Sequence, residues 1–148
     1  MNRAAGLDHL IDVVDGSFED IPAQDNGFDV VWSQDALLHS GDRTRVLEEV
    51  VRVMRSNGHF GFTDPMATDG ASSEALRPIL DRLHLDSMGT PGFYDREAAR
   101  LGLTKVEFDD LSEQLPTHYG RVLAETEARE SELTGKISEA YLSRMKTG

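Results

Sequence analysis

Short apolar runs and amphipathic stretches alternate along most of the chain. Apolar runs that end at turn residues predict strands over 9–14, 28–33 and 59–63, and the alternating pattern over 103–108 predicts a fourth. The run over 28–33 is continuous rather than alternating, which is typical of a parallel strand covered on both faces. Strands that alternate with helices in this way predict an α/β fold.

The clearest helical pattern covers 43 to about 55. It begins after Asp42, a good N-cap, and Asn57-Gly58 provides a stop signal. Its apolar positions are spaced to form one buried stripe, with Glu48 and Glu49 turned outward. The stripe consists of Val46, Leu47, Val50, Val51, Val53 and Met54.

Further helices are predicted over 73–85 and 95–101 and through most of 117–145. The chain contains no internal repeat, low-complexity tract or evident linker. Its length therefore predicts a single domain with room for a hydrophobic core.

The composition excludes several classes of protein. The absence of cysteine rules out disulfides, zinc–thiolate sites and thiol catalysis. No apolar run approaches the roughly 20 residues needed to span a bilayer, and Met1 to Gly6 lack the apolar segment of a signal peptide, so we expect a soluble cytoplasmic protein. The net charge of −12 would repel a phosphate backbone and argues against a nucleic-acid partner.

Polar side chains gather where two of the predicted strands end. Ser33-Gln34-Asp35 closes the strand over 28–33, and Asp64-Pro65-Met66 follows the strand over 59–63. Because open α/β sheets bind ligands outside the carboxyl ends of their strands, both segments are candidate site segments.

Asp35 and His39 are four residues apart, so a helical turn would place them on one face. Histidine accepts a proton near neutral pH, which makes His39 a candidate general base. Asp35 would then orient the imidazole or hold an ammonium group. The alternatives are that Asp35 caps the following turn and that His39 is a packed, hydrogen-bonded core residue. The histidines show no metal-binding spacing and no Gly-x-Ser-x-Gly elbow is present, so neither a metal site nor a nucleophilic triad is predicted.

Five segments of the chain follow the pattern of a known enzyme family. They are GSFEDIP at 16–22, FDVVWSQDALLHS at 28–40, RVLEEVVRVMRSNGHFGFTDPM at 45–66, LDRLHLDSMG at 80–89 and LSEQLPTHYGRVL at 111–123. Together they resemble class I S-adenosylmethionine-dependent methyltransferases, and more narrowly the sarcosine/dimethylglycine N-methyltransferases that make glycine betaine. WSQDALLHS and TDPM are the most specific parts, and the resemblance runs from about residue 4 to the end.

The resemblance implies a partial Rossmann-like class I methyltransferase sheet with flanking helices, in one domain over 1–148. Residues 1–66 would form the core strands and helix, and 67–148 would form the substrate-side helices, one strand and the C-terminal helix. It also implies S-adenosylmethionine as the cofactor and a small amine, sarcosine or dimethylglycine, as the substrate.

The resemblance further assigns roles to particular residues. His39 and Asp35 would be catalytic. Substrate binding would involve Asp35, His39, Asp64 and Met66, and cofactor binding would involve Ser17, Phe18, Glu19, Ser33 and Gln34. The alternatives are a tight turn at 17–19 with a buried Phe18 and a surface Glu19, and a strand end made by Pro65 beside Asp64. No feature of the sequence selects an arginine for the substrate carboxylate among Arg77, Arg82 and Arg121.

The chain also departs from the family pattern. The family's first strand, its glycine-rich cofactor loop, the acidic end of its second strand and its last strand have no counterpart here. In the family sheet, of order 3-2-1-4-5-7-6, this chain would supply strands 3, 4, 5 and 6, of which only 4 and 5 are neighbours. Each unsatisfied buried backbone group costs about 1–3 kcal/mol. We therefore expect the chain to rearrange, to exchange elements in a homo-oligomer, or to need the missing half from a partner or a longer protein.

Two other functions stay open beside a truncated betaine-pathway enzyme. One is a catalytically inactive methyltransferase-derived module that is stable only through self-association or a partner, which the missing glycine loop favours. The other is a methyltransferase with a different small-molecule acceptor, such as a sugar or a sterol.

Overall fold

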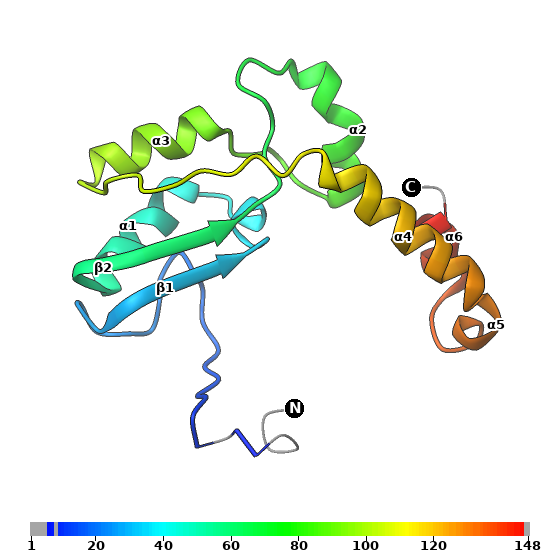
Figure 1. Ribbon diagram of the computed structural model, residues 1–148, viewed down its shortest axis with the longest axis horizontal. Coiled ribbons are helices and arrows are strands. Elements are labelled where there is room, and N and C mark those ends of the chain that lie inside the picture. The colour runs from blue at the N-terminus through cyan, green and yellow to red at the C-terminus, as the bar shows by residue number, and fades with distance from the viewer. Residues whose placement is uncertain (1–5, 8, 147–148) are drawn as a thin grey trace. The chain divides into compact units, whose positions relative to one another are not determined.

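The computed structural model describes residues 6–7 and 9–146 of the chain. The chain divides into two compact units, with the boundary between Lys105 and Val106. The first unit holds the sheet and the second is helical (Figure 1). A single domain over 1–148 stays a prediction.

The sheet of the first unit consists of two parallel strands, β1 (Phe28–Gln34) and β2 (Met54–Thr63). They confirm the predicted strands over 28–33 and 59–63, and the chain leaves β2 at Asp64-Pro65 as expected. Val31 pairs with Phe60 and Gln34 with Thr63, so the two carboxyl ends meet at one edge. Among the described residues this sheet has no third strand.

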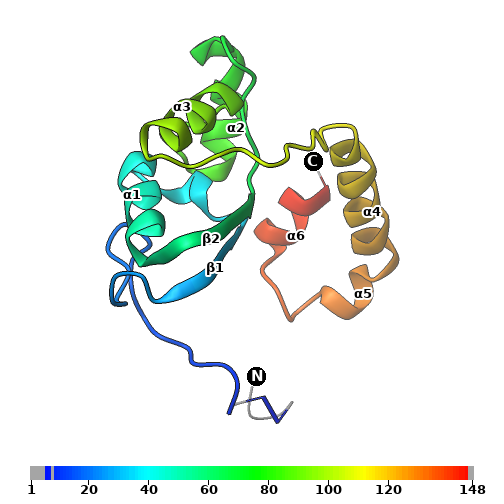
Figure 2. The same ribbon diagram turned by 60° about the vertical axis from the view of Figure 1, so that its left-hand side comes forward.

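The two other predicted strands are wrong. Residues 9–14 and 103–108 have no strand pairing, and the first segment leaves the sheet in both ribbon views (Figure 1 and Figure 2). Most of their apolar side chains face solvent, with Val13 82% and Val106 86% exposed. The apolar pattern is present in both segments, but a strand also needs a neighbouring strand to bond its backbone groups, and the part of the chain that the structure describes pairs no strand with either segment.

Helix α1 (Arg43–Val53) begins as predicted and ends early. The Asp42 carboxylate accepts a hydrogen bond from the backbone N–H of Arg45 at 3.0 Å, which confirms the N-cap. The helix stops four residues before Asn57-Gly58, because Met54 already has extended backbone angles and starts β2. Asn57 instead forms a left-handed turn within β2, at φ 65°.

The outward orientation predicted for Glu49 is also wrong. Its side chain is 1% exposed, whereas Glu48 beside it is 37% exposed. Glu49 accepts hydrogen bonds from Arg45, from Arg52 and from the backbone N–H of Ile21, so the charge is fully paired inside the first unit. Helical periodicity did not predict this because two of the partners stand on the same helix and the third is 28 residues away.

The remaining helices are close to their predicted positions. Helix α2 (Ser73–Leu83) begins at the predicted residue, and α3 (Pro91–Arg100) starts four residues earlier than expected because Thr90 caps it and proline is favoured at the first position. The second unit contains α4 (Gln114–Ala128), α5 (Glu130–Leu133) and α6 (Glu139–Lys146), which confirms the mostly helical tail.

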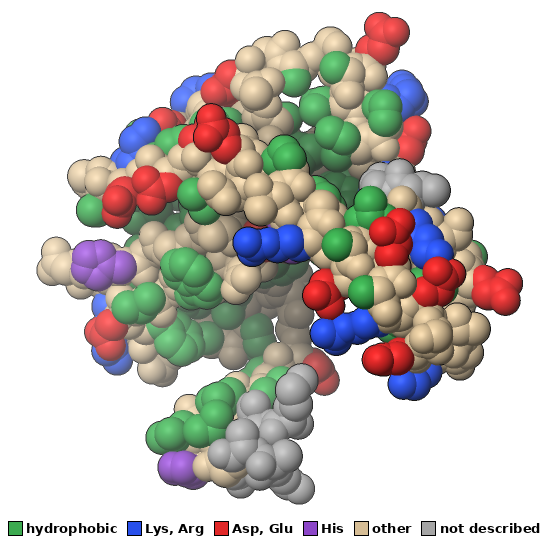
Figure 3. Space-filling model, turned by 45° about the vertical axis from the view of Figure 1, so that its right-hand side comes forward, with side chains coloured by type: hydrophobic (Ala, Val, Ile, Leu, Met, Phe, Trp, Pro, Cys, Tyr) green, Lys and Arg blue, Asp and Glu red, His purple; other side chains and the backbone are tan. Residues whose placement is uncertain are grey.

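The core of the first unit covers one face of the sheet. Helices α1 and α3 lie over this face (Figure 1 and Figure 2), and Leu37, Val46, Leu47, Val50 and Tyr94 form its buried cluster. The other face is open, and hydrophobic side chains gather on its surface (Figure 3). Trp32, which follows the core-packed Val31 along β1, is 65% exposed. The expectation that β1 is covered on both faces is therefore wrong for this chain.

The helices that the structure describes are all too short or too polar to cross a membrane.

Candidate functional site

The carboxyl ends of β1 and β2 form a rim at which two carboxylates lie close together. Asp35 follows β1 in a left-handed conformation, at φ 48°. Its backbone N–H donates to the Thr63 carbonyl at 2.8 Å, and the Thr63 hydroxyl donates to its carboxylate at 2.9 Å. Asp64 directly follows Thr63, the last residue of β2, so the sheet itself brings the two predicted aspartates to one edge.

The turn after Asp35 presents His39. A short 3-10 helix, η2 (Leu37–His39), replaces the α-helical turn that would have placed Asp35 and His39 on one face. That expectation is wrong, because the left-handed backbone at Asp35 breaks the helical spacing. Leu37, Leu38 and Ser40 are buried, whereas His39 between them is exposed. The alternative of a packed core histidine is therefore excluded in this structure.

Asp64 is half-buried and accepts two hydrogen bonds. The backbone N–H of Leu38 donates to one carboxylate oxygen at 2.9 Å, and the Tyr94 hydroxyl donates to the other at 2.8 Å. Burial raises the pKa of Asp64 and outweighs the opposing effect of these two bonds, and the nearby charge of Asp35 raises the pKa further.

The other residues predicted at the strand ends differ in exposure. Gln34 is exposed at the end of β1, and Ser33 is half-buried beside Phe62 of β2. Met66 packs against the buried cluster of the first unit. Their roles in cofactor or substrate binding stay predictions.

The segment Ser17-Phe18-Glu19 forms a tight turn on α1. The Ser17 side chain accepts a hydrogen bond from the Glu19 N–H at 3.1 Å, and Phe18 packs against the core cluster. The Glu19 carboxylate accepts hydrogen bonds from the Ser40 hydroxyl at 2.5 Å and from the Asp42 N–H at 3.2 Å. The bond from Ser40 lowers the pKa of Glu19. The Phe18 and Glu19 side chains thus both have structural partners within the chain.

Two side chains beside the site have partners that the sequence did not predict. Arg43 is 9% exposed, and its guanidinium donates to the Leu38 carbonyl at 2.8 Å and to the Ser87 carbonyl at 2.7 Å. Tyr94 is 5% exposed and is a core residue whose hydroxyl donates to the Asp64 carboxylate. Arg43 stood at the start of a predicted helix and Tyr94 one residue before another, and neither position reveals partners 44 and 30 residues away.

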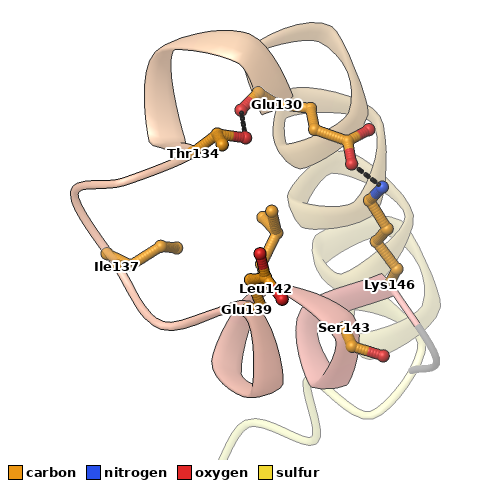
Figure 4. Close-up of a pocket in the computed structure, with 7 residues that line it drawn as sticks. All are labelled: Glu130, Thr134, Ile137, Glu139, Leu142, Ser143 and Lys146. Carbon is orange, nitrogen blue, oxygen red and sulfur yellow. Dashed lines mark hydrogen bonds and ion pairs between the residues drawn. The ribbon is translucent and has the colours of Figure 1, made fainter.

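A pocket of about 320 Å³ lies within the second unit (Figure 4). It is formed by α5, α6 and the connection between them, and Lys146 pairs with Glu130 across it at 2.6 Å. None of the predicted site residues lines this pocket. Within the part of the chain that the structure describes, no group of three or more histidine and carboxylate side chains could hold a metal ion.

Methyltransferases are among the known proteins that resemble this chain. Residues 1–62 match the model of the methyltransferase domain family. The chain is 65% identical, over its full length, to glycine/sarcosine/dimethylglycine N-methyltransferase of Actinopolyspora halophila, of which it covers 26%. It is 54% identical, again over its full length, to sarcosine/dimethylglycine N-methyltransferase of Halorhodospira halochloris, of which it covers 53%.

A solved structure shows the same fold. The crystal structure of a candidate sarcosine dimethylglycine methyltransferase from Galdieria sulphuraria matches 99% of this chain with a TM-score of 0.91 and 41% identity, and the match covers 54% of that protein. The chain therefore has part of the Rossmann-like fold of class I methyltransferases. Within that class it is a homologue of the sarcosine/dimethylglycine N-methyltransferases, which confirms the resemblance found in the sequence. It spans about half the length, or less, of these relatives.

Proposed function

We propose that this chain forms the substrate side of an S-adenosylmethionine-dependent N-methyltransferase that converts sarcosine and dimethylglycine to glycine betaine in the cytoplasm. The observation that carries the proposal is the acidic rim, where Asp35 and Asp64 stand at adjoining strand ends and the exposed His39 lies on the turn that follows Asp35. The names of the relatives support the substrate class.

The rim has the chemistry that a small amine substrate needs. At neutral pH the nitrogen of sarcosine or dimethylglycine is protonated, and a carboxylate attracts this cation. The hydrogen bond from Thr63 fixes the Asp35 carboxylate, so that it can hold the ammonium group in one place. His39 then accepts the proton, which leaves a neutral nitrogen with a free lone pair.

The cofactor fits the residues of this chain only in part. S-adenosylmethionine, when bound, supplies the methyl group from its sulfonium centre. Gln34 is exposed at the rim and offers both a donor and an acceptor, as a polar ligand requires. Glu19 and Phe18 are already bonded or packed within the chain, and the sequence contains no glycine-rich cofactor loop. We therefore propose that the remaining cofactor contacts come from another polypeptide segment, either joined to this chain or supplied by a partner.

A titration followed by NMR tests the proposal on the full chain. We expect dimethylglycine to shift the amide signals of Asp35 and the ring signals of His39, and S-adenosylhomocysteine to shift those of Gln34. Asp35→Asn should weaken the response to dimethylglycine at least tenfold. Asp29→Asn is the matched control, because Asp29 is an exposed aspartate of β1 away from the rim. A folded chain whose rim signals respond to neither compound contradicts the proposal.

A second candidate is a non-catalytic module that works only with a partner. The open face of the sheet favours it, because Phe28, Val30 and Trp32 stand at alternate positions of β1 and are 46%, 61% and 65% exposed. The mass of the chain in solution, measured during the same titration, separates the two. A self-associated or partner-bound chain without ligand shifts supports the module, and ligand shifts support the enzyme. Assays with other amines, sugars and sterols would identify a different acceptor.

A further inference from the structure

The peptide backbone just before His39 is held from both sides by charged side chains. The N–H of Leu38 donates to Asp64 at 2.9 Å, and the carbonyl of Leu38 accepts from Arg43 at 2.8 Å. Leu38 itself is 5% exposed. The carbonyl that accepts from Arg43 belongs to the peptide bond between Leu38 and His39. The position of the His39 backbone therefore depends directly on this hydrogen bond.

Asp64 and Arg43, the two side chains that bond the Leu38 backbone, are themselves hydrogen-bonded to other elements. The Tyr94 hydroxyl of α3 donates to the second oxygen of Asp64 at 2.8 Å, and the Tyr94 ring packs against Phe62 of β2. Arg43 donates to the hydroxyl and the carbonyl of Ser87 at 2.9 and 2.7 Å. The end of β2, the starts of α1 and α3 and the loop at Ser87 therefore converge on one short turn.

The result is a rigid turn with one exposed side chain. Leu37, Leu38 and Ser40 are buried, and the backbone N–H of Ser40 donates to the Leu37 carbonyl at 3.1 Å. His39 is the exposed residue among these four. Short polar side chains suffice to hydrogen-bond the backbone of an ordinary surface turn. This turn instead uses a buried arginine and a half-buried aspartate. Burying these charged groups is costly unless their hydrogen bonds have a strict geometry.

We propose that Asp64, Arg43 and Tyr94 are positioning residues, which fix the Leu37–His39 turn so that His39 is presented at the rim. This rests on the proposed function, in which His39 receives the proton of the amine. Asp64 acts here through the backbone of Leu38, and not as a direct ligand of the substrate ammonium group. The two roles differ in what they require: positioning needs a hydrogen-bond acceptor at residue 64, and a direct ligand needs a negative charge.

Two substitutions at one position separate these roles. Asp64→Ala removes the acceptor, and we expect hydrogen exchange at the Leu38 amide to accelerate about tenfold or more and the dimethylglycine shift of the His39 ring to weaken tenfold. Asp64→Asn keeps an oxygen for the Leu38 N–H and an amide that can donate to the Tyr94 oxygen, but carries no charge. Positioning therefore predicts that Asp64→Asn stays within about threefold of the unaltered chain in both measurements.

Tyr94→Phe is the second variant, for the case in which Asp64→Ala does not fold. It removes one bond to Asp64 and keeps the ring in the core, so Leu38 exchange should rise by about threefold. Asp29→Ala, away from the rim, should change nothing at Leu38.

Three results would overturn the inference. They are unchanged Leu38 exchange in a folded Asp64→Ala or Tyr94→Phe variant, faster Leu38 exchange in Asp64→Asn comparable to that in Asp64→Ala, and loss of the dimethylglycine shift in Asp64→Asn. If the unaltered chain shows no dimethylglycine shift, the proposed function fails, and Leu38 exchange still decides whether the three side chains hold the turn.

Discussion

Replacing Glu49 with glutamine is expected to destabilise the first unit by about 3 kcal/mol. The Glu49 carboxylate is 1% exposed and accepts two bonds from Arg52, at 2.9 and 2.7 Å, one from Arg45 at 2.9 Å and one from the Ile21 N–H at 2.9 Å. Arg52 also donates to the carbonyls of Ile21 and Ala23. The group therefore joins the loop before β1 to helix α1.

Two arguments give this magnitude. The hydrogen bonds from Arg52 hold the pKa of Glu49 at about 2, against the opposing effect of burial, where an ordinary glutamate has 4.5. A downward shift of this size on folding stabilises the folded state by about 3 kcal/mol at neutral pH. Removing one member of a buried ion pair costs about 3–5 kcal/mol, and we expect the lower end because Arg45 and Arg52 can be hydrated when Glu49 is gone.

The assay is urea unfolding at pH 7, followed by circular dichroism and by the fluorescence of Trp32. Trp32 is the one tryptophan of the chain and lies in β1, so its signal reports on the first unit. Glu48→Gln is the matched control. Glu48 is the neighbouring glutamate on α1, it is 37% exposed, and its pair with Arg100 at 3.0 Å should contribute less than about 1 kcal/mol.

The pH dependence gives an independent check. Because the folded pKa of Glu49 lies below its unfolded value, the stabilisation is complete above about pH 5 and declines as the pH falls toward 2. At pH 3 the difference in unfolding free energy between the unaltered chain and Glu49→Gln should shrink to about half. A loss no larger than that of Glu48→Gln at pH 7, or a difference that does not shrink in acid, would refute the reasoning.

Three further substitutions test local features of the fold, each by the urea midpoint of unfolding. Asp42→Ala removes the N-cap of α1 and should cost about 1 kcal/mol, and no loss would contradict the cap. Gly89→Ala should cost about 1–3 kcal/mol, because the new methyl group would lie 2.6 Å from the Tyr94 ring. Gly41→Ala, with open space around it, should have little effect, and equal losses would disprove the steric argument. His84→Gly should stabilise the chain by about 0.5 kcal/mol, since His84 ends α2 at φ 55°, and destabilisation would show that its side chain has a packing role.

The candidate site could be predicted from the sequence in part. The rim residues Asp35 and Asp64 follow strands that the hydrophobic pattern identified, and parallel pairing of those strands placed them together. The relation of Asp35 to His39 could not be predicted, because it depends on a left-handed residue and a 3-10 turn that only the surrounding contacts stabilise. The partners of Asp64 could not be predicted either, since they lie 26 and 30 residues away.

The sequence by itself determined the features of this protein that depend on a few neighbouring residues. These are the strands over 28–33 and 59–63, the start of α1 at its Asp42 cap, and the helical tail. Only the tertiary structure decided which apolar segments became strands and that Glu49 is buried while Glu48 is not. It also decided that Arg43 and Asp64 hydrogen-bond the backbone of Leu38. Backbone preferences act over one turn or one strand, whereas a strand edge, a buried charge or a clamped peptide is stable only when distant segments supply the matching hydrogen bonds.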